Sequence, residues 1–213
     1  MEELFIYLLK SAGVLSIFVL IYHFLLRKLT FFKANRFFLL FGIAASILFP
    51  FIEITQTVYV EQPQMMSMQP QFEPTMSIVQ EMNVDEPVID SGQLLMMLYT
   101  AISLFFLGKM TVELLSLRRL ILSGKRRMED GFVRISLSRK VTPFSFFKYI
   151  CFHVQDEQDP ANDLILKHEQ VHAREWHSVD LLITHFYCAV FWINPLAWLL
   201  KRQVGENLEF IAD

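Results

Sequence analysis

The stretch LFIYLLKSAGVLSIFVLIYHFLL, residues 4–26, decides the class to which this protein belongs. It is apolar apart from Lys10 and His23, and about 20 such residues are enough for a helix to cross the hydrocarbon core of a membrane. A cleavable signal peptide is the competing interpretation. However, the extreme N-terminus carries Glu2 and Glu3 in place of Lys or Arg, and no small-x-small cleavage site follows. The sequence therefore predicts an uncleaved membrane span.

The overall composition agrees with a membrane protein. Of the 213 residues, 54% are hydrophobic and only 19% are charged, a balance that an ordinary soluble domain rarely reaches. The net charge of -3 gives no indication of direct nucleic-acid binding. Two further apolar segments predict a second span over about 37–53 and a third over about 94–113.

The loops between the predicted spans differ sharply in charge. The loop RKLTFFKANR, 27–36, holds four positive charges, whereas residues 53–93 contain no Lys or Arg. Because positive loops stay in the cytoplasm, we expect the N-terminus outside and a flexible external loop over 55–92. The basic segment 118–127 then follows the third span on the cytoplasmic side, where anionic lipid explains its charge better than nucleic acid does. The lipid bilayer is thus the first predicted partner.

The chain is predicted to divide into a membrane region, 1–117, and a small α+β domain, 118–213. Two segments of the second region, GFVRISLS (131–138) and YICFHV (149–154), alternate apolar and polar residues as short half-buried strands do. We expect a substrate to lie extended along the edge of the strand from Tyr149 to Val154. The predicted fold class is a mainly α membrane protein with this small α+β domain attached.

Two prolines mark the helices of the second region. Asp159–Pro160 predicts the start of a helix through LILKHEQVHAREW, 164–176. Asn194–Pro195 divides the following residues into one helix from about Trp176 to Ile193 and another from Pro195 toward the C-terminus.

The first of these helices carries a His-Glu-x-x-His sequence, formed by His168, Glu169, Gln170, Val171 and His172. This spacing puts both imidazoles one turn apart on one helix face, where they can bind a single Zn²⁺. Glu169 is the expected base, because its carboxylate can take a proton from the water that zinc activates and pass it to the leaving amine. Two polar residues on a solvated helix face are the non-functional interpretation.

A catalytic zinc needs a third protein ligand and an open position for water. Glu209, in the sequence Glu-Phe-Ile-Ala-Asp, is the best candidate, and Glu206 one turn earlier is the alternative. Asp213 shares a helix face with Glu209 at i and i+4, so it can accept a hydrogen bond that orients a ligand histidine. His177 falls roughly opposite the face of His168 by helical arithmetic, which favours a surface or hydrogen-bonding role.

The lengths of the two last helices give an independent test of Glu209. A helix over 176–193 covers roughly 27 Å and the return from 195 to 209 roughly 22 Å. A hairpin that turns at Asn194–Pro195 therefore brings Glu209 back near the level of His172. A single span through 179–198 would leave it about 30 Å away across the bilayer. We expect a hairpin that is either re-entrant or lies on the membrane surface.

These segments resemble the membrane metallopeptidases of the beta-lactam-sensor (BlaR/MecR) antirepressor type, in the version found in Bacteroidetes. The resemblance covers nearly the whole chain and is carried by LLKSAGVLSIFVLIYHFLL (8–26), TFFKANRFFLL (30–40), PFSFF (143–147), LKHEQVHAREWHSVDLL (166–182), FWINPLAWL (191–199) and LEFIAD (208–213). The chain is also similar at a distance to the CAAX prenyl endopeptidases, which share the Glu-x-x-x-Asp element.

The resemblance implies a gluzincin-like site in a bacterial inner membrane, with His168, His172 and Glu209 as zinc ligands and Glu169 as the base. It also implies cleavage of the protein itself and of a cytoplasmic transcriptional repressor. The chain differs from the sensor branch in containing no extracellular penicillin-binding domain. Because relatives continue beyond Asp213, we expect a truncated chain.

The sequence therefore predicts a membrane-embedded zinc metalloendopeptidase that acts in regulatory proteolysis and transmembrane signalling. The main alternative is a non-catalytic signal transducer, in which zinc only holds the helices together and a fourth protein ligand closes the site. A prenyl-protein or general quality-control protease differs from the first prediction only in its substrate.

Overall fold

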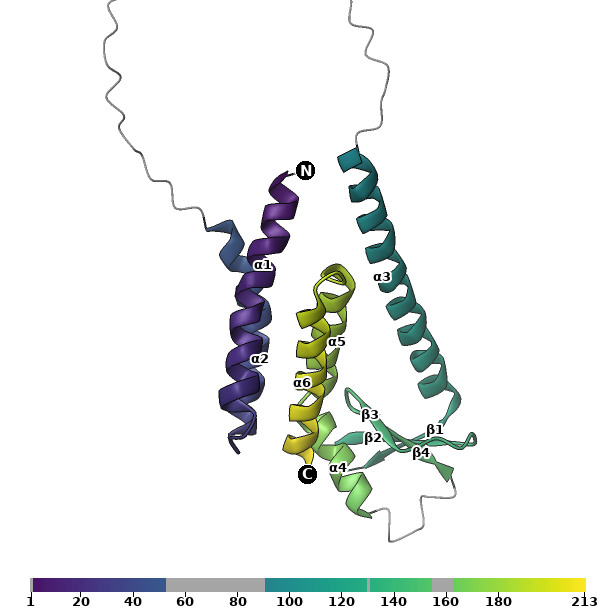
Figure 1. The fold of residues 1–213 in the computed structure, drawn as a ribbon. Coiled ribbons are helices and arrows are strands. Elements are labelled where there is room, and N and C mark those ends of the chain that lie inside the picture. The colour runs from purple at the N-terminus through teal and green to yellow at the C-terminus, as the bar shows by residue number, and fades with distance from the viewer. Residues whose placement is uncertain (1, 53–90, 130, 155–162) are drawn as a thin grey trace, which may run out of the picture.

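Three long helices dominate the structure, a computed structural model that describes residues 2–52, 91–129, 131–154 and 163–213 (Figure 1). Each is long and apolar enough to cross a membrane, over Glu3–Leu26, Phe32–Phe51 and Ser91–Ser123. The first is helix α1 (Glu2–Ile21) with a π-helical end, Tyr22–Leu26, and the second is helix α2 (Phe32–Leu48) with a 3-10 turn, Phe49–Phe51. The third is helix α3 (Ser91–Ser123).

The boundaries of these helices differ in part from the predicted ones. The first helix agrees with the predicted 4–26. Helix α2 begins at Phe32 and not at 37, because Lys33 and Arg36 in its first turns form ion pairs with Glu175 and Asp180. Helix α3 continues ten residues past 113, because Leu117, Leu120 and Ile121 of this extension pack against the sheet that follows. The predicted external loop 55–92 lies outside the described residues, except for its last two positions, which belong to α3.

Helices α1 and α2 pack closely side by side (Figure 1). They approach closely at Gly42, where a Cβ would lie 2.9 Å from Cβ of Phe18. Small residues at such points let two membrane helices approach each other.

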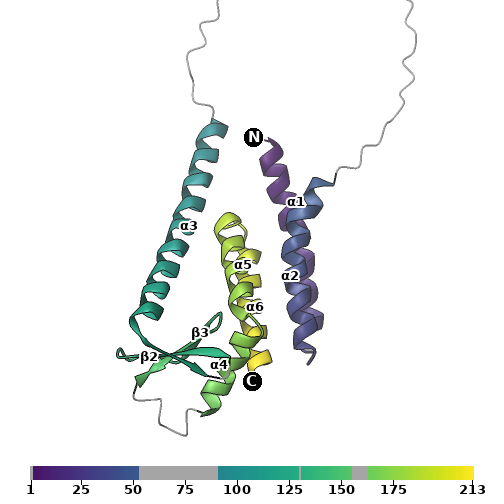
Figure 2. The same ribbon diagram turned by 180° about the vertical axis from the view of Figure 1, so that it is seen from behind.

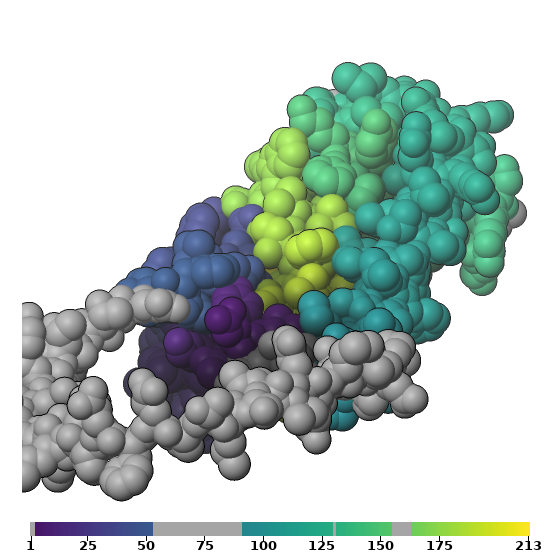
Figure 3. All heavy atoms as spheres, turned by 90° about the horizontal axis from the view of Figure 1, so that it is seen from above, coloured from purple at the N-terminus to yellow at the C-terminus, as the bar shows by residue number. Residues whose placement is uncertain are grey.

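The C-terminal part of the chain forms the predicted hairpin, from helix α5 (His177–Val190) and helix α6 (Pro195–Ala212). Asn194 caps α6, since its side chain accepts a hydrogen bond from the backbone N–H of Leu196 at 3.0 Å, and Pro195 opens the helix as expected. The hairpin lies between α1–α2 and α3 and runs alongside them (Figures 1, 2 and 3). The prediction of a hairpin turning at Asn194–Pro195 is confirmed.

Apolar contacts hold the hairpin against the first two helices. One buried cluster joins Leu15 and Val19 of α1 and Leu39 of α2 to Leu200 and Val204 of α6. The Tyr187 hydroxyl of α5 also shares a hydrogen bond of 2.9 Å with Ser46 of α2. The position of α6 is therefore set by the first helix pair.

A small mixed sheet follows α3 in the order β1-β2-β4-β3, with β2 and β4 parallel and the other pairs antiparallel. Its strands are β1 (Lys125–Glu129), β2 (Phe132–Leu137), β3 (Phe144–Phe146) and β4 (Tyr149–His153). The two predicted strands are confirmed as β2 and β4. Gly124 alone separates α3 from β1, and a Cβ at this position would overlap Ile135 of β2.

The prediction that Tyr149–Val154 offers a free edge is wrong. Strand β4 pairs with β2 over its whole length and with β3 over Tyr149–Cys151, so most of its hydrogen-bonding groups are used within the sheet. Strand β3 forms the edge on that side. Helix α4 (Asp163–Arg174) packs beside β3 and β4 and leads into the hairpin. Its predicted start at Asp159–Pro160 lies outside the described residues.

Candidate metal centre

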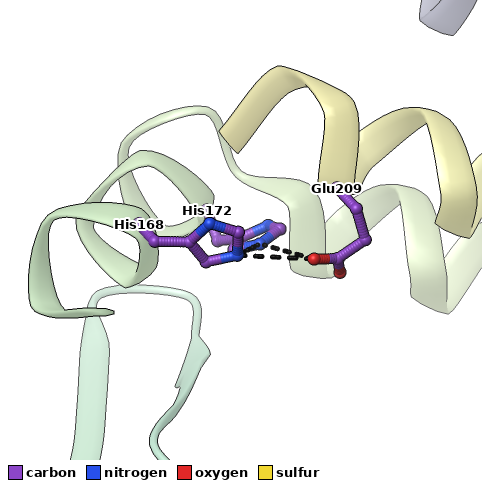
Figure 4. Close-up of side chains that lie close together, drawn as sticks. All are labelled: His168, His172 and Glu209. Atoms are coloured by element: carbon purple, nitrogen blue, oxygen red, sulfur yellow. Dashed lines mark hydrogen bonds and ion pairs between the residues drawn. The ribbon is translucent and has the colours of Figure 1, made fainter. Parts of the chain in front are cut away.

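Helices α4 and α6 bring three predicted ligands together (Figure 4). His168 and His172 project from one face of α4, and Glu209 reaches them from α6. Nε2 of His168 lies 3.1 Å from Nε2 of His172. Oε2 of Glu209 lies 3.4 Å from Nε2 of His168 and 3.7 Å from Nε2 of His172.

This triangle of atoms fits a tetrahedral metal ion. Zinc binds imidazole nitrogen and carboxylate oxygen at about 2.0–2.2 Å, so two of its tetrahedral ligands lie about 3.3–3.6 Å apart. The three observed edges scatter around that value. Two neutral imidazoles cannot both point acceptor lone pairs at each other without a proton or a cation between them. The donor set and its spacing therefore suit Zn²⁺.

The site is open to solvent on one side. The side chains of His168 and His172 are 26% and 14% exposed, whereas that of Glu209 is 62% exposed. Within the part of the chain that the structure describes, three groups gather here and not four. A site with three protein ligands keeps a coordination position for water or substrate, as catalytic zinc sites do.

Each of the two candidate ligand histidines has a hydrogen-bond partner on its other nitrogen. Nδ1 of His168 lies 3.1 Å from Oδ1 of Asp213, and Nδ1 of His172 lies 2.6 Å from Nδ1 of His177. A histidine that binds metal through Nε2 carries its proton on Nδ1, so both ligands would donate to these partners. Asp213 stands where its predicted orienting role requires.

The prediction that His177 lies opposite the site is wrong. Trp176 adopts the left-handed conformation, with φ +59°, and this breaks the helix between α4 and α5. The break turns His177 back toward His172, and His177 is only 1% exposed. Its predicted hydrogen-bonding role is retained, but the partner is His172 inside the protein and not a group at the surface.

Burial, and after it the nearby charges of His172 and Arg36, lowers the pKa of His177 to about 4. The imidazole is therefore neutral near neutral pH. A neutral ring can accept a hydrogen bond at Nδ1, which is what a metal-bound His172 needs from it.

Glu169 is half-buried and follows His168 by about 100° around α4. Burial, and secondarily the charge of Glu169, raises the pKa of the Cys151 thiol of β4 to about 12. Glu169 belongs to no ion pair found among the described residues.

Glu206, the alternative ligand, is engaged elsewhere. One of its carboxylate oxygens lies 3.2 Å from Nη2 of Arg27, and the other accepts a hydrogen bond of 2.8 Å from Nε of Arg202. Of the two candidates, only Glu209 reaches the histidines.

Comparison with protein-family models gives no match for this chain, and comparison with curated proteins gives none either. The functional interpretation therefore depends on the geometry of the site.

Proposed function

We propose that this chain is a membrane-bound zinc metallopeptidase with a gluzincin-like site. His168, His172 and Glu209 hold Zn²⁺, and Glu169 acts as the general base. The observation that carries this proposal is the triangle of 3.1, 3.4 and 3.7 Å between the three ligand atoms, with one coordination position left for the reaction.

The chemistry divides between the ion and the protein. Zinc, when bound, supplies Lewis acidity toward the scissile carbonyl and lowers the pKa of a water molecule toward about 7. Glu169 takes a proton from the attacking water and delivers it to the leaving amine. Asp213 and His177 keep the protons of the ligand histidines on Nδ1, so that both Nε2 atoms face the metal.

An extended peptide would reach the site along strand β3. This strand is the edge nearest to α4, and an unpaired strand edge can add a further strand through main-chain hydrogen bonds. The exposed side of Glu209 faces solvent, so a protein segment can approach without passing through the hairpin.

The positive charges support a cytoplasmic location. The basic loop 27–36, the basic segment 118–127 and the metal centre lie at the same end of the long helices (Figures 1 and 2). The positive-inside rule would place that end in the cytoplasm of a bacterial cell, with the α5–α6 hairpin re-entering the inner membrane from that side. The resemblance to antirepressor peptidases suggests a transcriptional repressor, or the chain itself, as the substrate.

The decisive variant is Glu169→Gln, which removes the base but none of the ligands. The full chain is purified in detergent, zinc is counted by elemental analysis, and cleavage of labelled casein is followed by fluorescence. We expect about one zinc per chain in both forms, and at least a hundredfold slower cleavage by the variant, because general-base catalysis contributes about 10²- to 10⁴-fold. Full cleavage by Glu169→Gln would refute the mechanism.

A matched pair of variants on α6 tests the ligand assignment. Glu209→Gln should lose zinc, whereas Glu206→Gln, one turn earlier on the same helix, should keep it because Glu206 contacts Arg27 and Arg202. Zinc binding without any cleavage by the wild-type chain would favour the alternative of a zinc-stabilised signal transducer.

A further inference from the structure

The corner between α4 and α5 controls one contact of the metal centre. It consists of Glu175, Trp176 and His177, and it places Nδ1 of His177 2.6 Å from Nδ1 of the ligand His172. Trp176 at the bend has a φ of +59°, a left-handed conformation that a large side chain rarely adopts and that persists only where the surroundings enforce it. The neighbours of the corner therefore determine where His177 lies.

The side chain of Arg36, on α2, contacts residues on both sides of this bend. Nη2 of Arg36, on α2, donates a hydrogen bond of 2.8 Å to the backbone carbonyl of Glu175, just before the bend. Nε of the same guanidinium lies 2.6 Å from Oδ2 of Asp180, in the first turn of α5. A guanidinium can hold two acceptors at once in a fixed geometry, which an ammonium cannot do.

The contact between Arg36 and Asp180 is buried. Their side chains are 12% and 4% exposed, and the close approach of Nε and Oδ2 is an ion pair without the alignment of a linear hydrogen bond. Removing one partner of a buried pair leaves the other charge uncompensated, so the surrounding chain rearranges to reach water. Loss of Arg36 would therefore displace the first turn of α5.

Other groups hold the corner less directly. Lys33 binds the Glu175 carboxylate at 2.9 Å, but its side chain is 69% exposed. From the sheet, the backbone N–H of Phe147 donates to the Ser178 hydroxyl at 2.9 Å. Arg36 bridges the two helices across the bend with a buried side chain.

We propose that Arg36 is a positioning residue for the metal centre. Without touching any ligand, it fixes the α4–α5 corner so that His177 meets His172, and it thereby makes zinc binding depend on a residue in the second candidate membrane span. This inference rests on the proposed zinc site at His168, His172 and Glu209.

The test compares zinc affinity in the full chain, purified in detergent, for the wild type, Arg36→Ala and Arg36→Lys. Zinc is titrated against a chromophoric chelator, and the visible spectrum of the Co²⁺ form reports ligand geometry. We expect Arg36→Ala to bind zinc about tenfold more weakly or worse, with an altered cobalt spectrum, because outer contacts of metal ligands change affinity by about 10- to 100-fold. Arg36→Lys should recover part of the affinity, since an ammonium can replace one contact but not both.

Arg27→Ala is the matched control. Arg27 belongs to the same basic loop and pairs with an acidic residue of the hairpin, Glu206, at 3.2 Å, but it does not contact the corner. Its removal should leave the zinc affinity and the cobalt spectrum unchanged. Wild-type affinity and an unchanged spectrum in Arg36→Ala would overturn the proposal.

A double-mutant cycle tests whether Arg36 affects zinc binding through His177. If Arg36 acts through His177, adding Arg36→Ala to His177→Ala should cause little further loss of zinc affinity, because coupled residues are not additive. Fully additive losses would overturn this route. Where Arg36→Ala does not fold, Arg36→Gln combined with Asp180→Asn removes both buried charges together. That pair should still bind zinc about tenfold more weakly, and wild-type affinity would overturn the proposal.

The outcomes separate this inference from the proposed function. Wild-type zinc binding without cleavage would leave the role of Arg36 standing and remove the peptidase. Cleavage that is insensitive to Glu169→Gln would refute Glu169 as the base and also leave the role of Arg36 standing. A chain that binds no zinc in any form would overturn both.

Discussion

If His168 and His172 bind zinc as proposed, their two hydrogen-bond partners should contribute unequally to metal affinity, because they differ in burial. Asp213 lies 3.1 Å from His168, but its side chain is 71% exposed. His177 is 1% exposed and lies 2.6 Å from His172. Water competes for an exposed hydrogen bond and screens its charge, whereas a buried donor left without an acceptor bears the full cost of desolvation.

The size of the difference follows from these exposures. Partners of metal ligands change metal affinity by about 10- to 100-fold, which corresponds to about 1.4 to 2.7 kcal/mol. We expect Asp213→Ala to fall at the lower end, with about a tenfold loss, and His177→Ala at the upper end, near a hundredfold. His177→Asn should recover part of this loss, because its amide oxygen can stand near the position of Nδ1 and accept from His172.

The measurement is a competition titration of zinc against a chelator at one pH, for the wild type and the three variants. The thermal midpoint of each metal-free form checks that folding is retained. An equal loss in both alanine variants, or a larger loss in Asp213→Ala, would refute the reasoning that burial decides the strength of these contacts.

Two further predictions concern packing and pH. Gly42→Ala should destabilise the α1–α2 pair by about 1–3 kcal/mol, since its Cβ would lie 2.9 Å from Cβ of Phe18. Gly13→Ala should not, because a Cβ there meets nothing within 4 Å. Denaturant unfolding in detergent compares the two variants, and equal effects would contradict the contact at Gly42. A hydrogen bond from Lys33 is the main cause that lowers the pKa of Glu175 below its ordinary 4.5. The ionised Glu175 carboxylate therefore stabilises the fold above pH 4.5. This stabilisation is lost as the pH falls further, because the unfolded chain then binds the proton more strongly. Thermal midpoints measured against pH should fall less steeply in Glu175→Gln, and identical slopes would exclude this contribution.

Much of the candidate site could be predicted from the sequence because its determinants are local. His168 and His172 face the same way on any regular helix, whatever surrounds it. Asn194–Pro195 marks a helix start through capping and through the fixed φ of proline, which placed the turn of the hairpin. Glu209 then followed from the rise per residue of the two helices.

The position of His177 could not be predicted in this way. A helix end is normally marked by Gly or Asn in the left-handed conformation, but here Trp176 adopts it under tertiary contacts. The Trp side chain gives no local signal of a break. Helical arithmetic, which assumes an unbroken helix, therefore predicted the wrong face for His177.

The sheet was predicted only in its buried strands. Strand β1 begins with Lys125, Arg126 and Arg127, which are exposed and show no alternation, and β3 has three residues, too few for a period to appear. Which strand forms an edge depends on both, so the edge was assigned to the wrong strand.

Helix α3 has a mechanical consequence for the sheet that it carries. Its 33 residues make a rod of about 50 Å, well beyond the roughly 30 Å of a hydrocarbon core. Only Gly124 separates it from β1, and there is no room at that joint for even one more carbon. A tilt of the rod by about 5° around its outer end would sweep the sheet sideways by about 4 Å. Catalytic groups must be held within about 0.5 Å, so a tilt of this size would exceed the tolerance of the proposed chemistry if the sheet carried the site with it.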